Sequence, residues 1–184
     1  MRIIAGQFRG RALTPVGKGD AGAHLRPTTD RVRESLFSVL THLDVLDNAR
    51  VLDLFAGTGA LGLEALSRGA TFATFVDSGR VAAGLIARNI ALTATAERTQ
   101  LIKRDAARIG PNPGDPATLV FLDPPYGQTL GATALAAADT NGWIAPGALV
   151  VWEEQAEQPA PPGFTRQDAR RYGDTFITLM WKDA

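Results

Sequence analysis

The chain has 184 residues, of which 45% are hydrophobic and 21% charged, with 19 basic side chains balancing 19 acidic ones. This size and composition fit one compact domain plus a small appendage. The absence of cysteine excludes disulfides and thiolate metal sites, and His24 and His42 are too isolated for a histidine site, so we expect no metal. No apolar stretch suggests a membrane span or a signal peptide, which predicts a cytoplasmic protein without a membrane partner.

The first part of the chain is basic. Residues 2–13 are predicted to form a short hairpin with turns at two glycines, and a glycine-rich connector follows it. Apolar residues at helical spacing then predict an amphipathic helix over residues 29–42, capped by Thr28 or Thr29. We expect residues 1–27, the hairpin and its basic connector, to be an appendage and residues 28–184 to be the main domain.

Strands and helices alternate after residue 50. Strands are predicted over 50–55, 72–77, 99–103 and 118–122, and helices over 59–68, 79–92 and 128–139. Such βαβ units build a parallel sheet covered on both faces. Three further strands are predicted over 149–153, 165–172 and 175–181, and the turn Gly173-Asp174 makes the last of them antiparallel.

Three glycines follow the strand predicted over residues 50–55. Gly57, Gly59 and Gly62 have the G-x-G-x-x-G spacing of dinucleotide-binding turns, and Asp77 closes the next predicted strand. The pattern alone allows a nicotinamide enzyme, because glycine is needed wherever a nucleoside closely approaches a strand-to-helix turn. The glycine spacing therefore leaves the cofactor open.

Asp53 lies inside the apolar strand, where an unpaired acid is costly. A sulfonium amino acid such as S-adenosylmethionine offers a partner, since its amino group can donate hydrogen bonds to this carboxylate. In this interpretation Asp77 accepts from the ribose hydroxyls and Asp105 from the adenine amino group. Gly57 and Gly59 leave room for the amino-acid portion. The alternative is that Asp53 and Asp77 only cap turns.

A second motif, Asp123-Pro124-Pro125-Tyr126, ends the strand predicted over residues 118–122. Proline fixes the backbone, so the Asp123 carboxylate and the Pro124 carbonyl are held as two acceptors. Two acceptors suit an exocyclic nucleobase amine, because hydrogen bonds to both its hydrogens favour the pyramidal nitrogen that frees its lone pair. Tyr126 would stack on the extruded base. We interpret Asp123 first as an orienting acceptor and second as a base; the alternative is an ordinary proline turn.

Both motifs, together with residues 2–11, 25–34 and 60–68, resemble the bacterial RsmD-type family. Members of this family methylate the exocyclic N2 of a guanine in 16S ribosomal RNA of the small subunit. The resemblance covers nearly the whole chain. It implies a Rossmann-like class I methyltransferase with a mostly parallel seven-stranded sheet, an antiparallel last strand and an N-terminal hairpin. It also implies S-adenosylmethionine as donor, S-adenosylhomocysteine as product, and 16S rRNA within a small-subunit particle as partner of a monomeric enzyme.

The resemblance makes residues 1–27 an RNA-binding appendage and residues 28–184 the S-adenosylmethionine-dependent methyltransferase domain. By position, it assigns a reaction loop, a donor site and an RNA surface. The reaction loop holds Asp123, Pro124 and Tyr126. The donor site holds Asp53, Gly57, Gly59, Asp77 and Asp105. Family members often have a second acid after Asp77, where this chain has Ser78, so ribose binding rests on Asp77 alone. Phosphate contacts, for which a solvated charged face is the alternative, are expected from Arg2, Arg9, Arg11, Arg26, Arg31 and Arg33.

Three rival functions stay open. An adenine-N6 methyltransferase can use the same Asp-Pro-Pro-Tyr loop, but the DNA enzymes usually need a separate region for sequence recognition. Only 64 positions separate Gly59 from Asp123, and predicted strands and helices fill them. A nicotinamide dehydrogenase predicts NAD binding and leaves the Asp-Pro-Pro-Tyr loop unexplained. A ribosome-assembly factor that binds RNA without catalysis predicts that Asp123→Ala behaves like the wild type.

Overall fold

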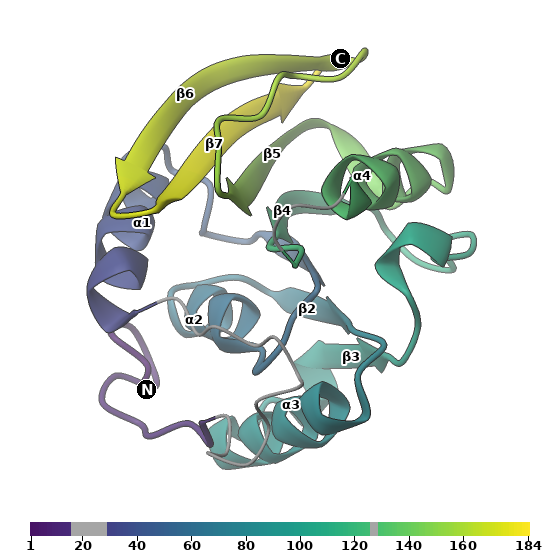
Figure 1. The fold of residues 1–184 in the computed structure, drawn as a ribbon. Coiled ribbons are helices and arrows are strands. Elements are labelled where there is room, and N and C mark those ends of the chain that lie inside the picture. The colour runs from purple at the N-terminus through teal and green to yellow at the C-terminus, as the bar shows by residue number, and fades with distance from the viewer. Residues whose placement is uncertain (16–28, 126–128) are drawn as a thin grey trace.

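A computed structural model describes residues 1–15, 29–125 and 129–184 (Figure 1). Within these ranges seven strands form one sheet in the order β3-β2-β1-β4-β5-β7-β6. The strands are β1 (Arg50–Leu54), β2 (Phe72–Val76), β3 (Thr99–Ile102), β4 (Ala117–Leu122), β5 (Ile144–Glu154), β6 (Phe164–Tyr172) and β7 (Thr175–Lys182). Neighbours from β3 to β5 pair in parallel, whereas β7 is antiparallel to both β5 and β6. The predicted class I sheet with its antiparallel last strand is confirmed.

Helices cover both faces of the sheet (Figure 1). Side chains alternate along each strand, so Leu119 and Phe121 of β4 pack into one core cluster while Val120 and Leu122 pack into the other. The first cluster includes side chains of α1 (Asp30–His42), α2 (Ala60–Ser67) and α3 (Arg80–Thr93), and the second those of α4 (Leu130–Thr140). Short 3₁₀ turns, η1 (Ala96–Arg98) and η2 (Ala106–Arg108), flank β3.

The predicted helices are present, with ends that differ from the prediction by two residues at most. Thr29 is the cap of α1, since its Oγ1 accepts the amide hydrogen of Val32 at 3.3 Å. Thr28, the other candidate cap, lies outside the described residues. Hydrophobic periodicity located these helices because each one buries a single apolar stripe or a whole surface against the sheet.

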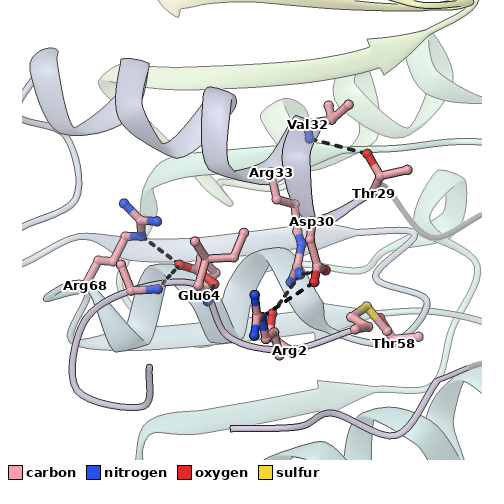
Figure 2. A network of polar contacts seen from close by, with 11 residues as sticks. Arg2, Thr29, Asp30, Val32, Arg33, Thr58, Glu64 and Arg68 are labelled. Carbon is pink, nitrogen blue, oxygen red and sulfur yellow. Dashed lines mark hydrogen bonds and ion pairs between the residues drawn. The ribbon is translucent and has the colours of Figure 1, made fainter. Parts of the chain in front are cut away.

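The predicted N-terminal hairpin is a turn-rich loop closed by one isolated bridge between Arg2 and Ala12. The amides of Ile3 and Leu13 donate across the loop to the carbonyls of Arg11 and Met1 at 3.0 and 3.2 Å, whereas the amides between them turn mostly toward α2. The carboxylate of Glu64 accepts the amides of Ile4 at 2.8 Å and Ala5 at 3.0 Å, and Ser67 Oγ accepts that of Phe8 at 2.9 Å. Figure 2 shows Glu64 between this loop and Arg68. We call residues 1–14 the N-terminal segment; it is mounted on the main domain through α2.

Gly6 permits the closest approach between the N-terminal segment and α2. Its φ is +80°, and an added Cβ would lie 1.8 Å from the carbonyl oxygen of Ser67. Gly10 has nearly the same φ, +81°, but an added Cβ there meets nothing within 4 Å. The two glycines therefore share the backbone requirement and differ in packing.

We expect Gly6→Ala to lower the free energy of unfolding by about 2–5 kcal/mol, because overpacking adds to the left-handed strain. Gly10→Ala should cost only the strain, about 1–2 kcal/mol. Urea unfolding monitored by circular dichroism measures both, provided that the slope with denaturant stays constant. Equal losses in the two variants would contradict the packing argument.

Candidate active site

Four carboxylates stand at the carboxyl ends of four adjacent strands. Asp105 follows β3, Asp77 follows β2, Asp53 lies in β1 one residue before its end, and Asp123 follows β4. The chain leaves β1 toward β2 on one side, and β4 lies on the other side, so the order of the strands reverses here. Open α/β sheets bind ligands at such a switch point. The structure thus brings to one sheet edge acids that span 70 residues of the sequence, from Asp53 to Asp123.

The turn after β1, residues 55–59, is built from left-handed backbone. Phe55 has a φ of 60°, Gly57 of 56° and Gly59 of 75°. Phe55 is not a glycine, so its conformation carries strain of about 1–2 kcal/mol. The amide of Ala56 donates to the carbonyl of Val76 at 3.1 Å, which holds the strained turn against β2. We call residues 55–59 the glycine turn.

Gly62, the third glycine of the fingerprint, serves packing. A Cβ at this position would lie 2.5 Å from Cε1 of Phe75, so a side chain there would separate α2 from β2. Close contact between the first helix and the sheet is the role that the third glycine has in dinucleotide-binding turns. It keeps the amino end of α2 over the carboxyl ends of the strands.

Asp53 is buried, with only 2% of its surface exposed. Its Oδ2 accepts the amide hydrogen of Gly62 at 3.0 Å, in the first turn of α2. Burial raises the pKa of Asp53 to about 8, and the negative charge of Asp77 adds to this, although the hydrogen bond from Gly62 opposes it. A buried acid with so high a pKa is poised to ionise when a cation arrives.

Asp77 connects two turns. Its Oδ2 accepts from the amide of Gly57 at 2.9 Å and its Oδ1 from the amide of Gly79 at 2.8 Å. Asp105 caps η2, since its Oδ1 accepts the amide of Ala107 at 2.9 Å. Asp53, Asp77 and Asp105 therefore all accept backbone amides, as the turn-cap interpretation requires. Each carboxylate oxygen can accept more than one hydrogen bond, so these contacts leave acceptor capacity for a ligand.

Asp123 begins the reaction loop at the end of β4. Its amide donates to the carbonyl of Leu54 at 3.4 Å, which places the loop beside the end of β1. The side chain is half-buried, Pro124 is buried and Pro125 is exposed. Tyr126, the predicted stacking residue, lies outside the described residues.

Two glutamates of β5 complete the electrostatics of this site, and sequence reasoning missed them. Burial raises the pKa of Asp123 well above its ordinary value, and the charges of Glu153, Asp53 and Glu154 raise it further. Glu153 and Glu154 are each 8% exposed, and Glu154 accepts the amide of Gln155 at 2.9 Å. The available signal was the one that singled out Asp53, namely acids that directly continue an apolar strand.

The structure corrects one predicted RNA contact and leaves others as predictions. Arg33 is fully buried, donates from Nη2 to the carboxylate of Asp30 at 2.6 Å and to the carbonyl of Arg2 at 2.7 Å, and cannot reach a phosphate (Figure 2). The helical period places Arg33 off the apolar stripe of α1, but the N-terminal segment packs on this flank of the helix and buries the side chain. Arg2, Arg9, Arg11 and Arg31 are exposed, and Arg26 lies outside the described residues.

Within residues 1–15, 29–125 and 129–184, no group of three or more His, Asp or Glu side chains could bind a metal ion. Nor does a helix in these ranges have the length and apolar character to cross a membrane.

Comparisons with known proteins agree with this architecture. The model of the family described as Conserved hypothetical protein 95 matches residues 1–181. Ribosomal RNA small subunit methyltransferase D of Escherichia coli K12 is 42% identical over 161 residues, which cover 88% of this chain and 78% of that protein. The protein of the same name from Haemophilus influenzae is 36% identical, over 86% of this chain and 81% of its own length.

A solved structure extends the likeness to the whole fold. The structure named "Putative methyltransferase yhhF from Escherichia coli" superposes with a TM-score of 0.85 at 38% identity, over 100% of this chain and 98% of that one. The family model thus matches residues 1–181, and the fold matches over the whole chain. The chain belongs to the family described as Conserved hypothetical protein 95 and is a methyltransferase of the RsmD type.

Proposed function

We propose that this enzyme transfers a methyl group from S-adenosylmethionine to the exocyclic N2 of a guanine in 16S ribosomal RNA of the small subunit. The names of its relatives support ribosomal RNA as the substrate. The observation that carries the proposal is the row of carboxylates along the sheet edge. A ribosomal substrate agrees with the predicted cytoplasmic location.

The order of the acids matches the order of the groups in the donor. From β3 to β1 the sheet edge presents Asp105, Asp77 and Asp53, which suit an adenine amino group, ribose hydroxyls and an α-ammonium group in turn. S-adenosylmethionine has these groups in the same sequence, and it supplies an electrophilic methyl group on a positively charged sulfur. Gly57 and Gly59 would hold its amino-acid portion. A nicotinamide dinucleotide offers no ammonium group for Asp53.

Asp123 and Pro124 would bind the acceptor base next to the donor site. The carboxylate and the proline carbonyl accept hydrogen bonds from the two hydrogens of one exocyclic amine, which holds its nitrogen lone pair toward the β1 end of the site. Because the pKa of Asp123 is raised, its carboxylate would also take up the proton that the methylated amine releases. Tyr126 keeps its predicted role as the stacking residue.

The exposed arginines of the N-terminal segment would contact RNA phosphates. The side chain of Arg2 is 70% exposed, and its distance to the Asp30 carboxylate is 4.0 Å, which is a weak surface ion pair. Arg9 and Arg11 are exposed on the same segment. No region of the described chain is left over for a dedicated RNA domain, so we propose that the substrate is a protein-bearing particle that presents one guanine. Efficient methylation of protein-free RNA would count against this.

The double variant Arg2→Gln, Arg9→Gln should weaken RNA binding and reduce the slope of log affinity against log salt by about 1.5–2, because each arginine releases about one counterion. Filter binding at several salt concentrations measures the slope. Arg166→Gln is the matched control, since the side chain of Arg166 is 49% exposed on β6, at the opposite edge of the sheet from β3. An equal loss in the control would place the RNA elsewhere.

Methyl transfer to defined particles tests the proposed function. Small ribosomal subunits that lack the modification are incubated with tritiated S-adenosylmethionine, and the RNA is digested to nucleosides. We expect label in N2-methylguanosine. Label in N6-methyladenosine would instead favour the adenine methyltransferase, and tight NAD binding without methyl transfer would favour the dehydrogenase.

A further inference from the structure

Asn89 lies on α3 between the glycine turn and the N-terminal segment, and it is fully buried. Its Nδ2 donates to the carbonyl of Thr58 at 2.9 Å and to the carbonyl of Thr14 at 3.4 Å. Its Oδ1 accepts the amide hydrogen of Thr14 at 2.7 Å. The Asn89 side chain thus connects Thr58 of the glycine turn with Thr14 at the end of the N-terminal segment, which are 44 residues apart in the chain.

The chemistry of this contact requires an amide. Both hydrogens of Nδ2 go to carbonyl oxygens and the Oδ1 oxygen accepts a backbone amide, so the group acts as donor and acceptor at once. A carboxylate of the same shape would place an oxygen against the carbonyls of Thr58 and Thr14. In a buried site such an arrangement is repulsive and leaves two acceptors unpaired.

Other contacts tie the same segment to the same side of the molecule. Thr58 Oγ1 contacts Met1 Sδ at 3.7 Å, so the glycine turn contacts the first residue of the segment as well as, through Asn89, the last. The side chain of Arg11 donates to the carbonyl of Leu92 on α3. Three of the arginines proposed to bind RNA, Arg2, Arg9 and Arg11, are therefore carried by a segment that contacts the glycine turn directly at Met1 and through Asn89 at Thr14. Figure 2 shows Thr58 of this turn beside the N-terminal segment.

We propose that Asn89 is a positioning residue that couples the donor site to the RNA-binding segment. Ordering of the glycine turn by the donor fixes Thr14 through Asn89, and ordering of the N-terminal segment by RNA fixes Thr58. Each ligand then binds more tightly when the other is present, by the same factor in both directions. This inference rests on the proposed function, because it takes S-adenosyl ligands at the glycine turn and RNA on the segment.

Equilibrium dialysis with radiolabelled S-adenosylhomocysteine, which permits no turnover, tests the coupling. Dissociation constants are measured for the protein alone and with saturating unmethylated small subunits. We expect tighter binding with subunits by about fivefold or more in the wild type, and a ratio near one in Asn89→Asp. Thr93→Val is the matched control, because Thr93 is a buried polar residue one turn later that bonds the Asn89 carbonyl but not Thr14 or Thr58. It should keep the wild-type ratio.

A measurement on the wild type avoids dependence on the folding of the variants. Hydrogen exchange of the Thr14 amide, which Asn89 Oδ1 accepts, should slow when S-adenosylhomocysteine binds, while peptides of β6 stay unchanged. Unchanged exchange at Thr14, or a wild-type affinity ratio of one with normal methyl transfer, overturns the coupling and leaves the proposed function standing. Failure of the wild type to bind S-adenosylhomocysteine overturns both.

Discussion

Asp123→Asn is expected to lower the rate of methyl transfer by about 100- to 10,000-fold while donor binding stays essentially unchanged. The asparagine amide places hydrogens where the carboxylate accepts those of the substrate amine, so the acceptor base is turned away. The donor carboxylates lie in β1 or follow β2 and β3, and the substitution leaves them intact. Single-turnover transfer to small subunits and calorimetry with S-adenosylhomocysteine measure the two effects separately.

The raised pKa of Asp123 also predicts how catalysis depends on pH. Burial and the charges of Glu153, Asp53 and Glu154 raise the pKa of Asp123 well above its usual value, so the acceptor form is lost on the acid side. At saturating donor, kcat/KM for the RNA substrate should therefore rise with pH, and Asp123→Asn should remove this ascending limb. Asp115→Asn is the control, since Asp115 is 81% exposed and precedes β4 at the opposite end of the sheet.

Wild-type activity in Asp123→Asn would remove Asp123 from the reaction and favour a factor that binds RNA without catalysis. A flat pH profile in the wild type would show that the raised pKa has no part in acceptor binding. If donor binding is lost together with activity, the substitution disturbs the glycine turn. This turn follows Leu54 directly, and the carbonyl of Leu54 accepts the amide hydrogen of Asp123.

Asp53→Asn should weaken donor binding by about 10- to 100-fold at pH 8 or above, because a charge-assisted hydrogen bond to the ammonium group is lost. Below pH 8 the loss should be smaller. Asp53 is mostly protonated there, since its pKa is about 8, and the wild type must release a proton to bind the cation. Calorimetry near pH 7 in buffers of different ionisation enthalpy should detect about one released proton in the wild type.

The same substitution should stabilise the fold while it weakens donor binding. The pKa of Asp53 is raised from 3.8 to about 8, so the stability that the protonated acid allows is present below pH 4 and is lost as the pH rises to 8. The loss is at most about 1.4 kcal/mol per pH unit in this window. Asparagine still accepts the Gly62 amide hydrogen and does not titrate. In urea unfolding, the free energy of unfolding of the variant should therefore increase relative to that of the wild type from pH 4 to pH 8.

Stability, donor affinity and proton release together separate the two interpretations of Asp53 that the sequence leaves open, a turn cap and a donor ligand. A residue that only caps α2 would show the pH-dependent stability difference with unchanged donor affinity and no proton release. A donor ligand shows all three effects. Glu97→Gln is a suitable control, because Glu97 is exposed in η1, away from the carboxyl ends of β1 and β4.

Sequence patterns located the helices and strands because local periodicity records which face of each element is buried. The alternation in β4 and the stripe of α1 are visible in the amino-acid order, and the structure confirms their place. Patterns failed where distant segments compete for a surface. Arg33 lies off the apolar stripe of α1, yet the N-terminal segment covers it, and the predicted hairpin gives the amides of Ile4 and Ala5 to Glu64.

The sequence by itself determined the parallel α/β class, the glycine turn and the Asp-Pro-Pro loop, because strand ends and turn residues are local properties of the chain. Only the tertiary structure decided which acids meet. Strand order buries Asp123 beside Asp53 and adds Glu153 and Glu154, and this burial, followed by the repulsion between the acids, raises the pKa of Asp123. Asn89 likewise has a role only in three dimensions, because its partners are brought to α3 by packing, which no short-range pattern records.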